Sequence, residues 1–242
     1  STDHNTVIPR IGFTYDLTDQ FTLYSNISKS FKPNAGADRN NQGFDPEEGI
    51  SYEIGSKYAL LDHKLSFENA IYYVKKENVL TLDPLDSTKS VAAGEVTSKG
   101  FDLSLVGNLT PEWKIIGNYA YTDAAVSKDN SLTKGTRLAN IPKDSFNLLS
   151  IYEFQSDALN GLGLGLNQRY VASRKGQTAN NTYSMGSYAT TDFISYYNLS
   201  SDIRFSFDIK NIFNKKYDDS AFNRYVYPGQ PRTVKLGMTY SF

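Results

Sequence analysis

Few side chains of this sequence are suited to catalysis. The 242 residues include only two histidines and no cysteine, which excludes a thiolate nucleophile and a thiolate metal site. His4 lies near the first residue and His63 in a predicted short turn, so a Ser-His-acid site has no placed base. The adjacent carboxylates of Asp218 and Asp219 could bind a cation, but two neighbouring acids in a polar loop are more often solvated. The side chains therefore predict neither an enzyme nor a metal site.

Side chains suited to ligand binding lie instead in the long polar segments of the chain. Aromatic faces and cations can contact an oxygen-rich ligand that has an apolar rim. The candidates of this kind are Phe44, Arg174, Tyr183, Phe222, Tyr225 and Tyr227. Each of them has an ordinary alternative, as a loop aromatic or a solvated charge. What they do together depends on the elements that hold the polar segments.

The last ten residues show how those elements are built. Apolar side chains occupy every second position from Val234 to Phe242, and the residues between them are small or polar. This period-2 alternation places one chemistry on each face of a β-strand. Taken alone, these ten residues fit a strand of a soluble β-sandwich equally well, so the rest of the chain has to decide.

Ten further segments repeat the pattern, and they are joined by short and long links in turn. The predicted strands are residues 9–17, 21–31, 50–60, 65–80, about 93–105, 113–126, 146–154, about 162–172, 188–199, 203–210 and 233–242. The long links are residues 32–48, about 81–92, 127–141, about 173–186 and about 214–231. All short turns then lie at one end of the sheet and all long loops at the other. Asn69 falls on an apolar face, and the pattern gives no reason for it.

Loop sorting and strand length favour a membrane barrel over a sandwich. Short periplasmic turns and long outer loops are typical of an up-and-down outer-membrane barrel, whereas a sandwich uses Greek-key crossings. The predicted strands run about 10 residues, against about 5 or 6 in globular proteins. No run of 18 apolar residues exists, so membrane-spanning helices are excluded. The fold class is therefore predicted as all-β, a transmembrane antiparallel up-and-down β-barrel.

The composition agrees with this prediction. The sequence has 18 Tyr and 14 Phe but one Trp, which suits strands and the aromatic girdles of barrels. Its net charge of -1 gives no indication of nucleic-acid binding. Eleven strands are an odd number, whereas single-chain bacterial barrels close with an even one. Unpaired strand edges cost several kcal/mol per backbone group in hydrocarbon, so we expect residues 1–242 to be one part of a larger barrel.

Several blocks of the sequence resemble a known family. The blocks are residues 9–12, 23–24, 30–33, 52–58, 94–102, 119–124, 141–143, 169–170, 210–217 and 229–232, followed by a strand that ends on Phe242. Each block is weak alone, but their order and spacing together resemble the C-terminal half of the barrel of TonB-dependent siderophore receptors, especially the ferrichrome or hydroxamate type. The barrel of this family has 22 strands around a plugged lumen, so the resemblance implies that about eleven of those strands are present here. The plug and the first half of the barrel are not in this sequence.

The resemblance implies a function as well as a fold. It implies a receptor in the bacterial outer membrane that imports a ferric siderophore into the periplasm, energised by TonB through the missing N-terminal part. Iron would arrive already chelated, so no cofactor is expected. The other implied partners are outer-membrane lipid and the barrel-assembly machinery, which would read Tyr240 and Phe242 as a C-terminal signal. A catecholate siderophore and a passive porin-like channel remain alternatives.

Overall fold

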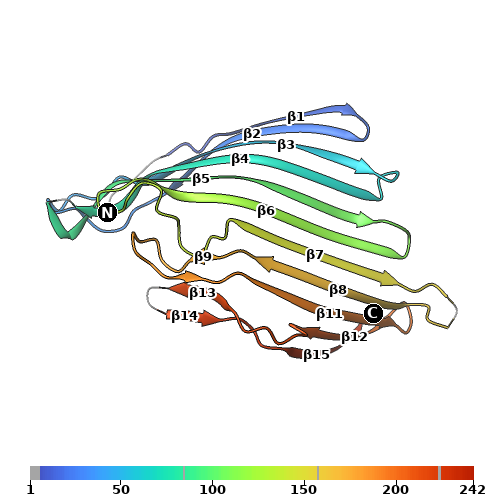
Figure 1. Cartoon of the computed structure of the whole chain (residues 1–242). Helices are drawn as coiled ribbons and strands as arrows, with labels where there is room; N and C mark the ends of the chain where they lie inside the picture. The colour runs from blue at the N-terminus through green and yellow to red at the C-terminus, as the bar shows by residue number, and fades with distance from the viewer. Residues whose placement is uncertain (1–5, 84, 157, 223–224) are drawn as a thin grey trace.

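The protein forms one large, curved and open β-sheet (Figure 1). The structure, a computed structural model, describes residues 6–83, 85–156, 158–222 and 225–242. The strands of the sheet are β1 (Arg10–Thr18), β2 (Phe21–Lys32), β3 (Glu47–Leu60), β4 (Leu65–Asp83), β5 (Asp86–Asn108), β6 (Trp113–Lys128), β7 (Asp144–Glu153), β8 (Leu162–Val171), β11 (Tyr188–Asn198), β12 (Ile203–Lys210) and β15 (Thr233–Tyr240). Two small hairpins pair β9 (Arg174–Lys175) with β10 (Ser184–Met185) and β13 (Asp218–Phe222) with β14 (Tyr225–Pro228).

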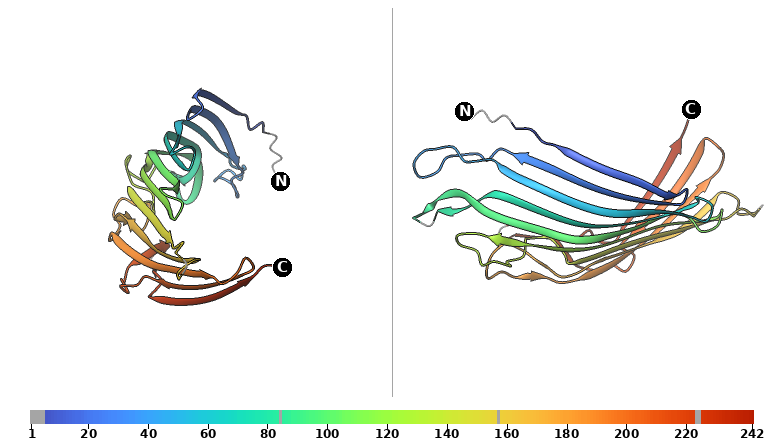
Figure 2. Two further views of the ribbon diagram at one scale, coloured as in Figure 1. Left: turned by 90° about the vertical axis from the view of Figure 1, so that its right-hand side faces the viewer. Right: turned by 90° about the horizontal axis from the view of Figure 1, so that it is seen from above.

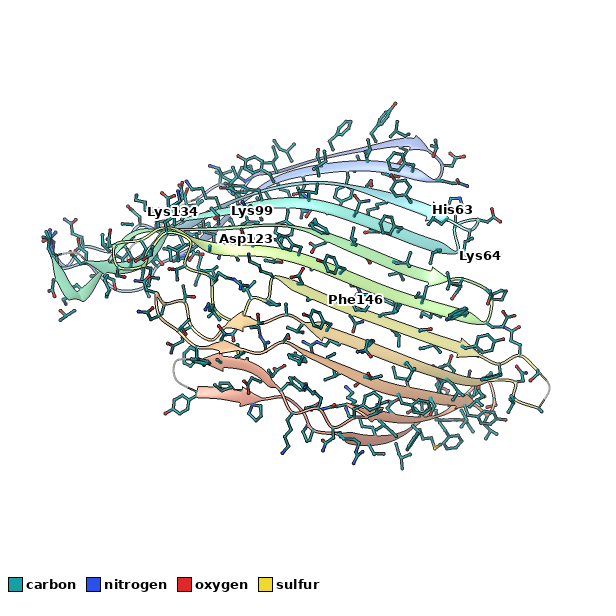
Figure 3. All side chains as sticks on the ribbon, in the orientation of Figure 1. His63, Lys64, Lys99, Asp123, Lys134 and Phe146 are labelled. Carbon is teal, nitrogen blue, oxygen red and sulfur yellow. The ribbon has the colours of Figure 1, made fainter. Side chains whose placement is uncertain are left out.

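The eleven strands pair antiparallel in chain order, with β1 and β15 at the two edges. Short turns lie at one end of the sheet and long loops at the other, as Figure 1 shows. Figure 3 labels His63 and Lys64 at the short-turn end and Lys134 at the long-loop end. The predicted up-and-down meander is confirmed. His4 and the predicted turn residue Asp157 lie outside the described residues.

The predicted long link at residues 81–92 is wrong, because most of it is strand. β4 continues to Asp83 and β5 begins at Asp86, so these strands have 19 and 23 residues. The register shifts twice between Lys76 and Leu80, and Asn78 has a φ of 58°. Such bulges move side chains between faces while pairing continues. The period-2 signal is lost there, although the hydrogen-bonded ladder is not.

The two faces of the sheet differ in chemistry along every strand. Directly paired residues share a face, and Ile54 pairs with Ile71, which in turn pairs with Phe101. At the far edge Phe207 pairs with Leu236, whose side chain is 81% exposed. A row of large apolar side chains therefore runs across the whole sheet on one face. Because these side chains are exposed rather than packed in a core, we assign this face to the lipid.

Two pairs of polar side chains on the apolar face are hydrogen-bonded across the strands. Asn69 stands directly opposite Ser56, and its Nδ2 donates to Ser56 Oγ at 2.8 Å. The indole Nε1 of Trp113 likewise donates to Ser150 Oγ at 2.8 Å. Polar groups inside hydrocarbon are tolerated when they have internal partners. The pairing with Ser56 explains Asn69, which sequence alone left unexplained.

The sheet curves into a trough, seen end-on in the left view of Figure 2. The polar face carries residues such as Asn26, Glu53, Lys57 and Glu68. Asn26 Nδ2 donates to Glu53 Oε1 at 3.1 Å, and Lys57 Nζ lies 3.4 Å from Glu68 Oε1. We assign this face to the concave side of the trough. No helix long and apolar enough to cross a membrane occurs in the described part of the chain.

Candidate functional site

A hollow of about 490 Å³ lies on the polar face near the long-loop end. Its wall comes from strands β5 to β8 and its roof from three loops that fold back over them. The wall residues include Asp102, Asn118, Asn147 and Arg169, and the roof residues include Asn140, Arg174 and Asp219. Residues far apart in sequence therefore meet at one place, which strand alternation alone does not reveal.

Arg174 ties two of the roof loops together. Its side chain is only 3% exposed. Its Nη2 donates to the main-chain oxygens of Asp218 at 2.5 Å and Asp219 at 2.6 Å. The guanidinium of β9 thus holds the first residues of β13. Its Nη1 is buried and has no hydrogen-bond partner in the described chain.

Asn140 fixes the same hairpin from the third loop. Its Nδ2 donates to Ala221 O and its Oδ1 accepts from Ala221 N, both at 2.8 Å. This two-point pairing imitates a β-ladder contact between residues 81 positions apart. Asn140 has a φ of 61°, a left-handed conformation that asparagine tolerates better than most residues. Ala221 is 4% exposed, so this face of the β13–β14 hairpin is packed.

The loop after β6 is joined to the loop after β8 by further side-chain contacts. Asn180 Oδ1 accepts from Thr133 N at 2.7 Å, and Thr178 Oγ1 accepts from Ala139 N at 2.9 Å. The loop begins at Asp129, whose Oδ1 accepts from Ser131 N at 2.8 Å. Burial alone would raise the pKa of Asp129, but backbone donors lower it below the ordinary value. This carboxylate is therefore charged at neutral pH.

Two aromatic rings, those of Tyr188 and Tyr217, pack beside the arginines of the hollow. The ring of Tyr188 stacks on Tyr217 at a centroid distance of 4.0 Å. A Cβ placed on Gly229 would lie 2.1 Å from the Tyr217 ring, so only glycine allows that ring to lie flat on the backbone. The guanidinium carbons of Arg169 and Arg174 lie 5.9 Å and 5.4 Å from the Tyr188 centroid. Both distances fall within the range of cation–π contacts.

Asn211 closes the outer end of β12. Its Nδ2 donates to Lys215 O at 2.9 Å and Gln230 O at 3.0 Å, and its Oδ1 accepts from Lys215 N at 2.8 Å. Its own N–H donates to Asp192 Oδ1 at 2.8 Å. The residue is 3% exposed and has a φ of 50°. The sequence blocks 210–217 and 229–232 are therefore joined by one hydrogen-bond network, which anchors the two ends of the last long loop.

Three of the predicted ligand-binding residues form one exposed aromatic face. Phe222 pairs with Tyr225, and Ser220 pairs with Tyr227, so the three rings lie on the same side of the β13–β14 hairpin. They are 66%, 71% and 51% exposed, in the order Phe222, Tyr225, Tyr227. Ala221, on the opposite side, is packed against Asn140. The structure thus brings these three candidates together beside the roof.

The other predicted residues lie apart from that face. Tyr183 is 40% exposed and lies over Gly176 in the loop that holds β9 and β10. Phe44 is 7% exposed and packs near Gly36 inside its own loop. Arg174 is buried beneath β13, as described above. Tyr240 lies on the apolar face opposite Ile203, and Phe242 is fully exposed beyond it.

Sequence reasoning named Arg174 as a candidate but missed the other residues that build the hollow. Arg169 is a charge at a polar-face position of a predicted strand, and Tyr188 is an aromatic residue at another. Those two signals could have marked them. Asn140 carried no signal, and Asn211 was marked only as part of the block 210–217, because the partners of both amides are main-chain atoms brought near by the fold. No group of three or more acidic or histidine side chains suited to a metal ion occurs among the residues described.

Comparisons with known proteins agree with this architecture. Residues 1–212 match the family described as TonB dependent receptor-like, beta-barrel. The Metal-pseudopaline receptor CntO of Pseudomonas aeruginosa is 40% identical over 97% of this chain, which covers 33% of that receptor. The Ferrichrome outer membrane transporter/phage receptor of Escherichia coli is 32% identical over 96% of this chain, which covers 32% of it. The crystal structure of the siderophore receptor PiuA from Acinetobacter baumannii superposes with a TM-score of 0.84 at 27% identity, covering 96% of this chain and 35% of that one. The chain therefore spans about a third of the length of these relatives, which are receptors and transporters of the outer membrane rather than enzymes.

Proposed function

Because the chain belongs to the TonB-dependent receptor β-barrel family, we propose that residues 1–242 are the C-terminal part of the barrel of an outer-membrane receptor that imports a metal–siderophore complex. The observation that carries this proposal is the polar hollow at the loop end, beside the exposed aromatic face of the β13–β14 hairpin. The unpaired edges of β1 and β15 support pairing with further strands. TonB would act through segments outside this chain.

The cargo we propose is a ferric siderophore, with a hydroxamate type favoured by the blocks described above. The relative named as a ferrichrome transporter supports a hydroxamate. The relative named as a metal-pseudopaline receptor supports a chelated metal more broadly. A catecholate complex is the alternative. In each case the metal is part of the cargo and not a cofactor of the protein.

The exposed rings are the proposed first contact for the cargo. Phe222, Tyr225 and Tyr227 offer flat apolar faces with two hydroxyl groups at the loop end. Tyr183 is the next candidate because its ring is also partly exposed. Phe44 is buried inside its own loop, so contact with cargo would require that loop to move. Arg174 is also buried, but it lines the hollow and contact with it would come from there.

Uptake by the full-length receptor tests this function. Cells that depend on it should take up radioactive iron from at least one ferric siderophore, and removal of TonB should stop that uptake. Replacing both Tyr225 and Tyr227 by Ala should weaken binding about tenfold or more, as expected when two aromatic contacts are lost. Leu85→Ala is the control, because Leu85 is 76% exposed at the tip of the β4–β5 hairpin. Uptake without TonB would indicate a passive channel instead.

Lipid contact of the apolar face is a second part of the proposal. Leu236→Arg places a charge on that face and should cost roughly 2–4 kcal/mol of folding free energy near the bilayer midplane. Lys235→Leu changes the opposite face, where Lys235 pairs with Asp208, and should cost less. Folding of the full receptor into vesicles measures both changes. The reverse ranking would refute the assignment of faces.

Recognition of Phe242 by the barrel-assembly machinery is proposed on the resemblance alone. The ring is exposed and lies 6.3 Å from that of Tyr240, centroid to centroid. Phe242→Ala in the full receptor should lower the amount that reaches the membrane without changing the binding of cargo by the receptor that does. Normal assembly of the variant would remove Phe242 from this role.

A further inference from the structure

Two arginines face the hollow without an acidic partner. Arg169 projects from the polar face of β8, where it is paired with Asn147 and Thr190. Arg174 reaches the same hollow from β9. Within the described ranges, no carboxylate oxygen lies within 4.0 Å of either guanidinium. Arg169 is exposed to the hollow, whereas Arg174 is buried. A buried arginine is usually paired with an acid, so the absence of a carboxylate beside Arg174 needs an explanation.

Of the two arginines, Arg174 gives the clearer indication that a ligand binds in the hollow. Its Nη2 is already used by two main-chain oxygens, which fix the plane of the guanidinium. Its Nη1 is buried and lacks an acceptor, and Arg174 is one of the residues that line the hollow. A buried donor without an acceptor is costly, and native proteins rarely keep one without a reason. A ligand oxygen that reached Nη1 from the hollow after a small shift of its lining would supply the missing acceptor, and the guanidinium is already ordered by its bonds to β13.

We propose that the hollow is a carboxylate-binding subsite, in which Arg174 Nη1 and the Arg169 guanidinium hold a free carboxylate of the metal complex. The inference rests on the proposed function, since it names a chemical group of the cargo. A carboxylate fits better than a neutral carbonyl because charge-assisted hydrogen bonds to arginine are shorter and stronger. The volume of about 490 Å³ lies within the range of small-molecule sites.

The other charges of the hollow restrict further which ligands can bind. Asp102 and Asp219 also line it, so its formal charge is balanced and it does not collect anions in general. A simple polyanion would be repelled by these two acids. A ligand that places its carboxylate on the arginines and a hydroxyl, amide or ammonium donor towards the aspartates satisfies both. Tyr188 lies within cation–π range of both arginines and so helps to fix where they lie.

A matched pair of probes tests the subsite in the full-length receptor. One probe is ferrioxamine B acylated with succinate, which carries one free carboxylate away from the iron; the other is its methyl ester. Binding to the purified receptor is followed by quenching of protein fluorescence. The acid should bind about tenfold or more tightly than the ester, the usual scale for a charge-assisted pair. Equal binding of acid and ester to the unchanged receptor would overturn the proposal.

Variants show whether the two arginines cause the preference for the acid over the ester. Arg169→Gln removes a cation that makes no hydrogen bond of its own within the described chain, and Arg174→Lys keeps the charge but loses the fork geometry. In both, the ratio between acid and ester should fall towards one. Arg204→Gln is the control, because Arg204 stacks at 3.9 Å on Tyr196 outside the hollow, and its ratio should stay unchanged. Should Arg174→Lys fail to fold, Arg169→Gln decides.

The remaining outcomes separate the subsite from the proposed function. If the ratio survives in Arg169→Gln, or falls equally in Arg204→Gln, the effect is long-range electrostatics and the subsite is refuted. If neither probe binds but the receptor transports another ferric chelate without a free carboxylate, the subsite is refuted and the function stands. If no ferric chelate is transported at all, the function fails and the subsite with it.

Discussion

The two sides of the long-loop end are stabilised in different ways. From β3 to β6 the contacts include ion pairs between partly exposed side chains, such as Lys76 with Glu47 at 2.9 Å and Lys75 with Glu95 at 3.2 Å. The amide of Asn78 also donates to Pro46 O at 3.0 Å there, but Asn78 is only half-buried. From β6 to β15 the loops are held by side chains that bond to main-chain atoms, namely the buried Arg174 and Asn211 and the more exposed Asn140. All ion pairs within the described residues involve positions 39–128. The first side is an extended hairpin, and the second is a roof over a hollow.

The difference shows what each kind of contact can specify. An exposed ion pair contributes little and tolerates many geometries. A buried amide or guanidinium that bonds main-chain atoms allows only one geometry, because any other geometry leaves polar groups unpaired. Loops held in the second way keep a fixed shape, which a binding hollow requires. The variants below test this contrast, from the largest expected effect to the smallest.

Asn211→Ala should have the largest effect. It removes three side-chain hydrogen bonds and leaves Lys215 and Gln230 with unpaired main-chain groups. We expect a loss of about 3 kcal/mol, at about 1 kcal/mol for each hydrogen bond. Unfolding of the full receptor in detergent measures it. Asn41→Ala is the control, since Asn41 also has a positive φ, of 62°, but sits in a loop outside the roof; an equal loss there would assign the effect to the backbone alone.

Asn140→Ala should loosen the roof without unfolding the sheet. It removes both bonds to Ala221, and we expect a local loss of about 2 kcal/mol. Amide hydrogen exchange of the full receptor should become faster at Ala221 and in the rest of β13, and should not change in β2 or β3. Asn140→Gly keeps the left-handed backbone and also removes the side chain. If the glycine variant exchanged like the unchanged receptor, the amide would have no structural role.

The pair formed by Lys76 and Glu47 should matter least. Its Nζ–Oε1 distance is 2.9 Å, yet a double-mutant cycle with alanine at both positions should give a coupling of only about 0.2–1 kcal/mol. The coupling should shrink in high salt, because screening weakens exposed pairs. A coupling energy larger than the free energy lost in Asn140→Ala would contradict the contrast between the two sides.

Part of this architecture is readable without coordinates, and part is not. The number and order of the strands, the two faces and the sorting of turns follow from period-2 alternation, because a pleated strand turns successive side chains to opposite sides. That signal failed for residues 81–92, because bulges between Lys76 and Leu80 and between Leu82 and Asp83 interrupt the alternation but not the pairing. It also left Asn69 unexplained, since its partner Ser56 lies across a strand pair.

The order of the residues thus predicts a lipid-facing antiparallel sheet and the loops that carry its aromatic residues. Which of those residues meet is seen only in the folded protein. Phe222, Tyr225 and Tyr227 share one exposed face, whereas Phe44 and Arg174 are buried. The hollow joins Arg169 to Arg174 and Tyr188 through contacts between separate strands and loops. Alternation encodes the side of the sheet on which a residue lies, but how a long loop folds back depends on hydrogen bonds to main-chain atoms distant in sequence, which no local pattern records.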